Sequence, residues 1–236
     1  MKILSLDSSA TVASVALFEC DQSCGKLLSE FTVNNGNTHS ETLLPMVETV
    51  LKTYGITPKE IDVFAATTGP GSFTGVRIGA ATIKGLAFGT DKPCVEVSTL
   101  EAIAENLCVR DGLICPVMNA RRSQVYTALF RAENGKLFRL MEDSAISIEE
   151  LDGILSAYNE PVSLAGDGYD ITASGLKLTE VLPTPERLRH QSAASVASVA
   201  CRQLTNGSAV SDKELKVTYL RPSQAERTRL EKENLK

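Results

Sequence analysis

The sequence predicts an α/β fold made of two copies of one domain, each a mixed β-sheet flanked by helices. The early parts of the two halves match. Asp7 lies eleven residues before Phe18 in DSSATVASVALF, and Asn119 lies eleven residues before Phe130 in NARRSQVYTALF. In each half an amphipathic helix follows, and then a strand closed by a glycine turn, GPG in the first half and GDG in the second. The period exceeds 100 residues, which is too long for a solenoid repeat and indicates a duplicated domain.

This duplication sets the expected domain boundaries. A chain of 236 residues suffices for one large domain or two modest ones. We place an N-terminal subdomain at residues 1–105 and a C-terminal subdomain at residues 106–221. The last segment, residues 222–236, alternates charges and has little apolar content, so we expect a solvated tail that is either a frayed helix or disordered.

Hydrophobic periodicity assigns the elements of the first half. Apolar residues of HSETLLPMVETVLKTYG recur at the spacing of one helical face, and Pro45 bends or tightens that helix near its start. Thr57 and Glu60 form a capping box around Pro58, at the start of a short helix. In order, the pattern predicts strands at 3–6, 12–17 and 27–33, a helix at 40–54, the short helix from 58, a strand at 61–66, a helix at 73–88, a strand in DKPCVEVST and a helix in LEAIAENLC.

The second half has a similar order of elements. A strand, a polar turn and a returning strand are predicted in LICPVMNARRSQVYTALFR, and a helix in SIEELDGILSAY. A strand ending in a glycine turn follows in PVSLAGDGYD. A helix rich in small residues is predicted in SAASVASVACRQL, and a last extended piece in VTYLRP.

The glycine turn in ATTGPGSFTGVRIG, residues 65–78, is neither a P-loop nor a dinucleotide fingerprint. A P-loop needs Lys and then Ser or Thr after its last glycine, whereas Val76 and Arg77 follow Gly75. The stretch GPGSFTG is one residue longer than G-x-G-x-x-G, and no acidic residue lies about twenty positions further on.

The same turn has two remaining interpretations. Glycine lets the backbone approach an anion, and a helix N-terminus offers free amides to it. A turn relieved by Gly71 and capped by Ser72 needs no ligand at all. If the turn binds an anion or a nucleotide, the candidate contacts are Asp7, Gly69, Gly71 and Ser72.

The helix after this turn is unusually rich in small residues. Each glycine inside a helix costs about 1 kcal/mol relative to alanine, so Gly75, Gly79 and Gly85 indicate close approach by another backbone. The approaching element is either a neighbouring strand of the same domain or a helix of another chain. The helix at 40–54 is also broadly apolar, and two such helices offer more apolar surface than one sheet needs to cover.

Isolated polar residues give weaker signals. Asp7 could hold a metal or water beside a nucleotide, but a turn aspartate that caps its own backbone is common. Its counterpart Asn119 cannot act as a base and is a weak metal ligand, although Asp167 in GDG could substitute. His39 lies at a helix entrance, where capping or a surface position is more usual than catalysis.

Composition limits the class of protein. A net charge of −5 argues against a protein whose main task is to grip nucleic acid. The first residues are interrupted by Asp7 and several hydroxyl residues, unlike a signal peptide, and no apolar run is long enough to span a membrane, so we expect a cytoplasmic protein. No CxxC spacing exists, and we expect six reduced, mostly buried thiols and no zinc site: Cys20, Cys24, Cys94, Cys108, Cys115 and Cys201.

The order of elements is similar to that of the actin, sugar-kinase and Hsp70 ATPase (ASKHA) superfamily, which on its own assigns no function. Six segments together resemble the TsaB (YeaZ) family, from Ile3 to Pro222: ILSLDSSATVASVAL, HSETLLPMV, GPGSFTGVRIGAATIKGLA, VSTLEAIA, NARRSQVY and YLRP. Members of this bacterial family help to make the threonylcarbamoyl modification on adenosine 37 of tRNA. The resemblance implies the ASKHA fold shared with TsaD, the catalytic subunit and paralogue.

The resemblance also implies that this chain is a scaffold without catalytic residues, metal or cofactor. TsaD carries an HxxxH metal motif, and Thr99 and Ile103 stand at the two histidine positions in VSTLEAIA. Neither side chain can hold a metal in that role. The family usually has DAR where this chain has NARR, so Asn119 weakens any nucleotide chemistry in the second half.

The implied partners are TsaD in a heterodimer, the P-loop ATPase TsaE, a second copy when the chain is alone, and tRNA only indirectly through the complex. By resemblance, pairing uses the N-terminal domain, through the helices after HSETLLP and after GPGSFTG. The residues that we expect at this interface are Leu43, Leu44, Val47, Val50, Leu51, Gly75, Val76, Gly79, Ala80 and Ile83. The alternatives are an active ATPase or small-molecule kinase of the same superfamily and, less favoured, a zinc peptidase, for which ligands are lacking.

Overall fold

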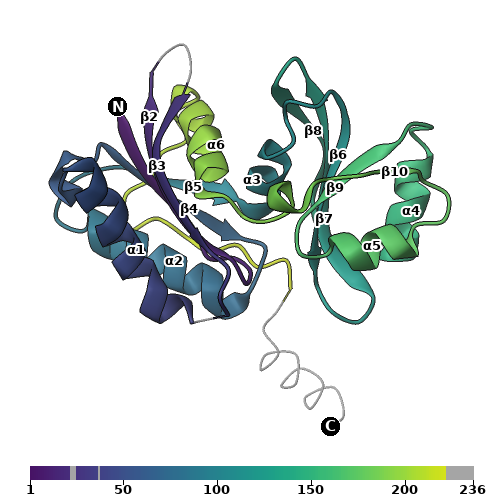
Figure 1. Ribbon diagram of the computed structural model, residues 1–236, viewed down its shortest axis with the longest axis horizontal. Coiled ribbons are helices and arrows are strands. Elements are labelled where there is room, and N and C mark those ends of the chain that lie inside the picture. Colours follow the sequence, from purple (N-terminus) through teal and green to yellow (C-terminus); the bar gives the residue numbers. More distant parts are fainter. Residues whose placement is uncertain (22–24, 37, 222–236) are drawn as a thin grey trace, which may run out of the picture.

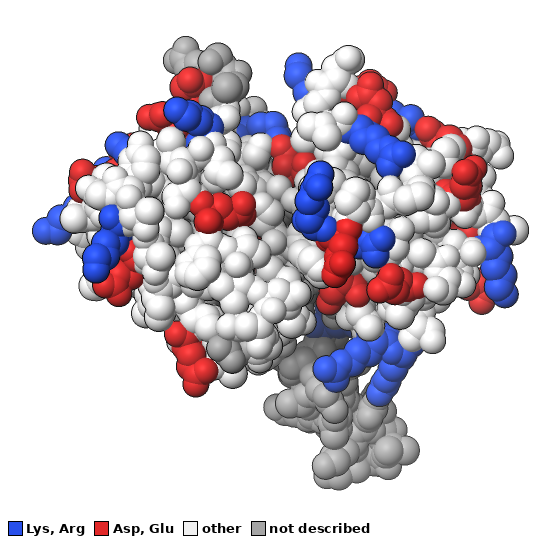
Figure 2. Space-filling view, in the orientation of Figure 1, with Lys and Arg blue, Asp and Glu red and all other residues white. Residues whose placement is uncertain are grey.

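Two lobes lie side by side in the molecule, and each contains one β-sheet (Figure 1). The computed structural model describes residues 1–21, 25–36 and 38–221. The predicted tail at 222–236 therefore lies outside the described residues. Charged side chains of both signs are spread over the two lobes (Figure 2).

The first lobe follows the predicted order of elements. Thr57 and Glu60 form the expected capping box at the short helix, and Gly55 ends the preceding helix with a φ of 79°, a conformation that favours glycine. The elements are β1 (Lys2–Asp7), β2 (Ala13–Cys20), β3 (Gly25–Val33), α1 (His39–Tyr54), the 3₁₀ helix η1 (Pro58–Glu60), β4 (Val63–Gly69), α2 (Phe73–Ala87), β5 (Cys94–Ser98) and α3 (Thr99–Glu105).

The second half of the chain contains four elements that the sequence pattern did not predict, namely β8 (Lys136–Ser147), α5 (Tyr169–Gly175), β10 (Val181–Leu182) and the 3₁₀ helix η2 (Glu186–Leu188). The elements are β6 (Gly112–Asn119), β7 (Gln124–Glu133), β8 (Lys136–Ser147), α4 (Ile148–Ser156), β9 (Val162–Ala165), α5 (Tyr169–Gly175), β10 (Val181–Leu182), the 3₁₀ helix η2 (Glu186–Leu188) and α6 (Ala193–Thr205).

The two sheets have the same topology. The first has the strand order β3-β2-β1-β4-β5, and the second has β10-β9-β6-β7-β8. In each sheet the first strand pairs antiparallel with the second and parallel with the fourth. Helices follow the third, fourth and fifth strands in both lobes. The predicted duplicated α/β fold is therefore confirmed.

Helices cover both faces of the first sheet. On one face, α1 and α2 pack a core that includes Leu43, Val47 and Ile83 against β1 and β4. On the other face, Val196 and Ala200 of α6 pack against β1, β2 and β5 (Figure 1). The predicted unit at 106–221 is thus corrected, because its last helix belongs to the core of the first lobe.

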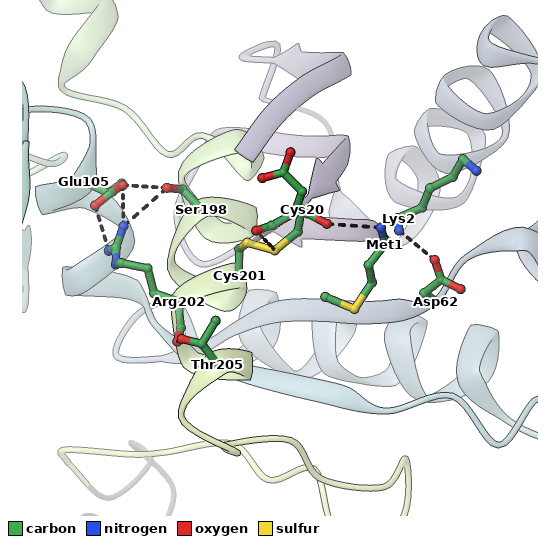
Figure 3. Close-up of a disulfide and its surroundings, with 10 residues drawn as sticks. Met1, Lys2, Cys20, Asp62, Glu105, Ser198, Cys201, Arg202 and Thr205 are labelled. Atoms are coloured by element: carbon green, nitrogen blue, oxygen red, sulfur yellow. Dashed lines mark hydrogen bonds and ion pairs between the residues drawn. A yellow bond between two sulfur atoms is a disulfide. The ribbon is translucent and has the colours of Figure 1, made fainter. Parts of the chain in front are cut away.

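A disulfide joins Cys20 at the end of β2 to Cys201 in α6 (Figure 3). The two residues are 181 positions apart in the chain and their Cα atoms are 5.9 Å apart. The expectation of six reduced thiols is therefore wrong for this pair, because α6 packs on the first sheet and brings the two sulfurs together. Cys94, Cys108 and Cys115 are free thiols, and Cys24 lies outside the described residues.

Ion pairs connect α3 to both lobes. Arg202 of α6 binds Glu105 of α3 through two hydrogen bonds of 2.7 and 2.8 Å (Figure 3). Arg139 of β8 pairs with Glu101 of α3 at 3.3 Å and with Asp143 at 2.6 Å. The helix α3 therefore links the first sheet to the second through charged side chains as well as through its apolar residues.

Candidate functional site

A cleft with a volume of about 740 Å³ lies between the two lobes. Its walls come from the β1–β2 turn, the start of α2, the β6–β7 turn, the glycine turn after β9, and residues 218–221. The lining includes Ser9, Gly71, Ser72, Asn119, Asp167 and Tyr219. This is the place where the glycine turns of the two halves meet.

The first glycine turn is shaped by the β1–β2 turn of the same chain. Ser72 donates its backbone N–H to the Ser9 carbonyl oxygen at 2.7 Å, and its hydroxyl oxygen accepts the N–H of Gly75 at 3.2 Å. A Cβ added to Gly71 would lie 2.5 Å from the Ser9 carbonyl oxygen. The close approach of the β1–β2 turn therefore explains why position 71 is a glycine, and Ser72 caps the helix.

The four candidate anion contacts divide into two pairs. Gly71 and Ser72 line the cleft. Gly69 is buried, and a Cβ there would strike the Thr218 carbonyl oxygen. Asp7 is completely buried and does not reach the surface of the cleft. Only the first pair is therefore placed to touch a ligand in the cleft.

Asp7 and Asn119 are used in turns. The Asp7 Oδ1 atom accepts the Ser9 backbone N–H at 2.8 Å and the Ser9 hydroxyl at 2.6 Å. Burial raises the pKa of this carboxyl, against the lowering effect of the Ser9 bonds. Asn119 Oδ1 likewise accepts the Arg121 N–H at 2.8 Å, and its own N–H donates to Asp167 at 3.2 Å. The turn interpretation thus accounts for the Oδ1 atoms of both residues.

His39 does not cap the helix that it begins, because Thr38 occupies the N-cap position of α1. Its Nε2 atom bonds instead to the carbonyl oxygen of Ala10, 29 positions earlier, at 2.6 Å. Its Nδ1 atom is buried and has no hydrogen-bond partner among the residues that the structure describes. His39 therefore fixes the β1–β2 turn beside the cleft, a contact that local sequence could not indicate.

Thr99 begins α3 directly after β5, and Ile103 lies about one turn further along the helix. Both side chains are fully buried, and Ile103 packs in the core between α3 and the second sheet. A hydroxyl and a hydrocarbon offer no imidazole to a metal. Within the described ranges, no three His, Cys, Asp or Glu side chains gather as a possible metal site.

The predicted interface residues lie mostly inside this chain. All of them except Leu44 are buried, so the expectation that their side chains meet another chain is corrected. Gly75 and Gly79 face Ser8 at the end of β1, where an added Cβ would strike its carbonyl or hydroxyl oxygen. At Gly75 and Gly79, the backbone that approaches the helix therefore belongs to the neighbouring strand of the same domain, which is one of the two expected alternatives.

The outward side of α2 carries a stripe of small and apolar residues that are not among the ten expected at the interface. Ile78, Ala81, Gly85 and the C-cap residue Phe88 recur every three or four residues, and we call them the α2 stripe. Ile78 is half-buried and packs partly against the core. Ala81 and Gly85 are exposed, and Phe88 is 72% exposed. On the adjacent helix α1, Leu44 is 56% exposed. Two packed helices therefore present small and apolar groups to the outside.

The chain matches the family model described as TsaD, tRNA N6-adenosine threonylcarbamoyltransferase, over residues 27–232. It is 33% identical over 184 residues to the tRNA threonylcarbamoyladenosine biosynthesis protein TsaB of Bacillus subtilis (strain 168), which covers 78% of each chain. It is 29% identical to the protein of the same name in Escherichia coli (strain K12), over 95% of this chain and 96% of that one.

Two further similarities involve a transferase and a solved structure. The tRNA N6-adenosine threonylcarbamoyltransferase of Rhizobium meliloti (strain 1021) is 32% identical over 146 residues, 55% of this chain and 40% of that protein. The structure of YeaZ from Pseudomonas aeruginosa matches with a TM-score of 0.79 over 93% of this chain and 99% of that one, at 24% identity. This last similarity shows a shared fold.

Proposed function

Because the chain belongs to the TsaB family, which takes part in tRNA threonylcarbamoyladenosine biosynthesis, we propose that it is a non-catalytic partner subunit that binds and stabilises TsaD. In this role it is required for threonylcarbamoyl transfer to adenosine 37 of tRNA but supplies no reacting group. The proposal implies a cytoplasmic protein. Among the described residues, no helix has the length and apolarity to cross a membrane.

The exposed α2 stripe is the observation that supports this proposal most strongly. Gly85 weakens a helix by about 1 kcal/mol relative to alanine, yet a Cβ added there would meet no described atom within 4 Å beyond its chain neighbours and the nearby backbone of α2. The packing of this chain therefore gives no reason for a glycine at that position. Close approach by a helix of another chain does give one, and Leu44 and Phe88 supply apolar area beside it.

The cleft supports a non-catalytic role. The Oδ1 atom of Asp7 is engaged by Ser9, and its counterpart is Asn119. By the resemblance to TsaD, Thr99 and Ile103 stand where that paralogue has its two metal-binding histidines. An acid engaged in this way by its own turn is poorly placed to position a metal or to activate water.

The same face would serve several assemblies in turn. We propose that it binds TsaD in the heterodimer and a second copy when TsaD is absent, and that TsaE joins the heterodimer. Because one face serves both kinds of pairing, TsaD should compete with self-association.

Analysis of tRNA from cells that lack this chain tests the proposal. The modified nucleoside should disappear and should return when the wild-type chain is supplied, whereas the purified chain alone should transfer no threonylcarbamoyl group. Normal levels of the modified nucleoside in the deleted strain would contradict the proposal.

A further inference from the structure

The cleft has a cluster of arginines and aromatic rings at its edge, which we call the arginine rim: Phe73, Arg77, Arg121, Tyr219 and Arg221. The Arg77 guanidinium carbon lies 3.7 Å from the centre of the Phe73 ring, and that ring stacks on Tyr219 with 4.9 Å between centres. Arg77 also donates a hydrogen bond to the Tyr219 hydroxyl. The Arg77 guanidinium carbon also lies 5.4 Å from the centre of the Tyr219 ring, so the cation and the two rings all contact one another.

Two further guanidinium groups line the cleft itself. Arg221 donates to the Ala120 carbonyl oxygen at 3.2 Å and lies 5.9 Å from the centre of the Tyr126 ring. Arg121 is exposed in the β6–β7 turn, and no ion pair or side-chain hydrogen bond joins it to another described residue. Figure 2 shows Lys and Arg side chains gathered at the lower end of the boundary between the lobes. This region is cationic in a chain whose net charge is −5.

The opposing negative charge in the cleft is small. Asp167 is the one acidic residue among the described residues of the lining. Its carboxylate is exposed and accepts the N–H of Asn119, and it stands against two arginines of the lining, Arg121 and Arg221. An anionic ligand would therefore meet more positive than negative charge.

We propose that the arginine rim and the cleft bind an unpaired segment of RNA. Proteins bind single strands by stacking bases on aromatic rings and by placing arginines beside phosphates. Tyr219 is 41% exposed and offers a ring surface, Arg121 and Arg221 offer the cations, and the cavity of about 740 Å³ can receive an unstacked base. That the strand is RNA rests on the proposed function. The inference adds direct contact between tRNA and this chain, in a cleft that performs no chemistry.

Fluorescence anisotropy with a fluorescein-labelled oligoadenylate RNA of about ten nucleotides, a length typical of single-strand sites, tests the proposal on the full chain. Tyr219→Ala should weaken binding by about tenfold, the loss expected for one base stack. Tyr219→Phe keeps the ring and should bind nearly as the wild type does. Arg121→Gln should reduce the slope of log Kd against log salt by about 0.7, as for one lost contact to a single-strand phosphate.

Arg187→Gln is the matched control, because Arg187 is exposed and lies outside the cleft lining; its RNA affinity should match that of the wild type. Circular dichroism should show that each variant is folded. Absence of RNA binding by the wild type, equal affinity of all variants, or displacement of the RNA by AMP as readily as by unlabelled RNA would each overturn the proposal.

Capture by immobilised TsaD separates this inference from the proposed function. The variants at Tyr219 and Arg121 should still be captured, because these two positions lie outside the α2 stripe and away from Leu44. A wild-type chain that binds the RNA but not TsaD would contradict the partner role and still support the RNA site. A wild-type chain that binds TsaD but not the RNA would contradict the RNA site and still support the partner role.

Discussion

Gly79 of α2 lies directly against Ser8 at the end of β1. A Cβ on Gly79 would fall 2.6 Å from the Ser8 hydroxyl oxygen and 3.0 Å from a methyl carbon of Leu6. Ser8 also donates a hydrogen bond to the Gly75 carbonyl oxygen at 2.9 Å. The small residues on the inner side of α2 thus admit the first strand of the same chain, whereas Gly85 on the outer side faces open space.

This difference predicts that two matched substitutions in α2 affect the stability of the protein differently. Gly79→Arg should lower the free energy of unfolding by at least about 1–3 kcal/mol, because the side chain must displace β1. Gly85→Arg should leave it unchanged or raise it by up to about 1 kcal/mol, because arginine favours a helix more than glycine does. Thermal unfolding followed by circular dichroism measures both. Equal melting temperatures for the two variants would show that the inner contact is not tight.

The free energy of unfolding of Asp7→Asn should exceed that of the wild type by an amount that grows as pH rises. Burial raises the pKa of Asp7 in the folded state, so the folded wild type holds a proton more tightly than the unfolded chain. Its stability therefore falls as pH rises from the ordinary aspartate pKa through the raised folded value. An amide keeps the acceptor for Ser9, as Asn119 does for Arg121, and it cannot lose a proton and become charged.

Urea unfolding at about pH 4 and about pH 8 measures this effect. The advantage of Asp7→Asn should be larger at the higher pH. Asp7→Ala, which also removes the charge but leaves the Ser9 N–H without its acceptor, should be less stable than Asp7→Asn by about 1–3 kcal/mol. An advantage for Asp7→Asn that shrinks as pH rises would contradict the burial of an ionisable Asp7.

Cys201→Ser should lower the free energy of unfolding by about 2–4 kcal/mol, because the disulfide to Cys20 restricts the unfolded chain. Reductant should lower the melting temperature of the wild type to that of the variant and should not affect the variant. Cys108→Ser, at a half-buried free thiol, is the control. A wild-type melting temperature that is insensitive to reductant would show that the bond does not form in solution.

The isolated chain should not hydrolyse ATP in the presence of Mg²⁺. The Oδ1 atom of Asp7 is occupied by Ser9, and the equivalent position of the second lobe has Asn119, which cannot act as a base. A phosphate-release assay on the purified chain measures this. Turnover that disappears in Asp7→Asn would favour an active ATPase instead.

Much of the fold could be predicted from the sequence because its elements are local and periodic. The hairpin, α1, α2 and α6 have unbroken apolar patterns, and the two halves share the spacing from Asp7 to Phe18 and from Asn119 to Phe130. The strand β8 was missed because its inward side carries charge. Arg139 and Asp143 interrupt the apolar alternation, and their pairing with each other and with Glu101 is visible only in three dimensions.

The candidate site was less predictable because its determinants are long-range contacts. Composition identified α2 as a helix that another backbone approaches, but it could not tell the inner glycines from the outer one. Likewise, the packing of α6 on the first sheet, and with it the bond between Cys20 and Cys201, depends on residues 181 positions apart. The contact between His39 and Ala10 also joins separate elements.

Size-exclusion chromatography with light scattering, on this chain mixed with TsaD, tests the central claim most directly. The wild type should elute with TsaD as one complex, whereas Gly85→Arg, which remains folded, should elute separately from TsaD. Ala157→Arg, just after α4 on the opposite lobe, should behave as the wild type does. Co-elution of Gly85→Arg with TsaD at the wild-type ratio would contradict the assignment of the α2 stripe as the partner face.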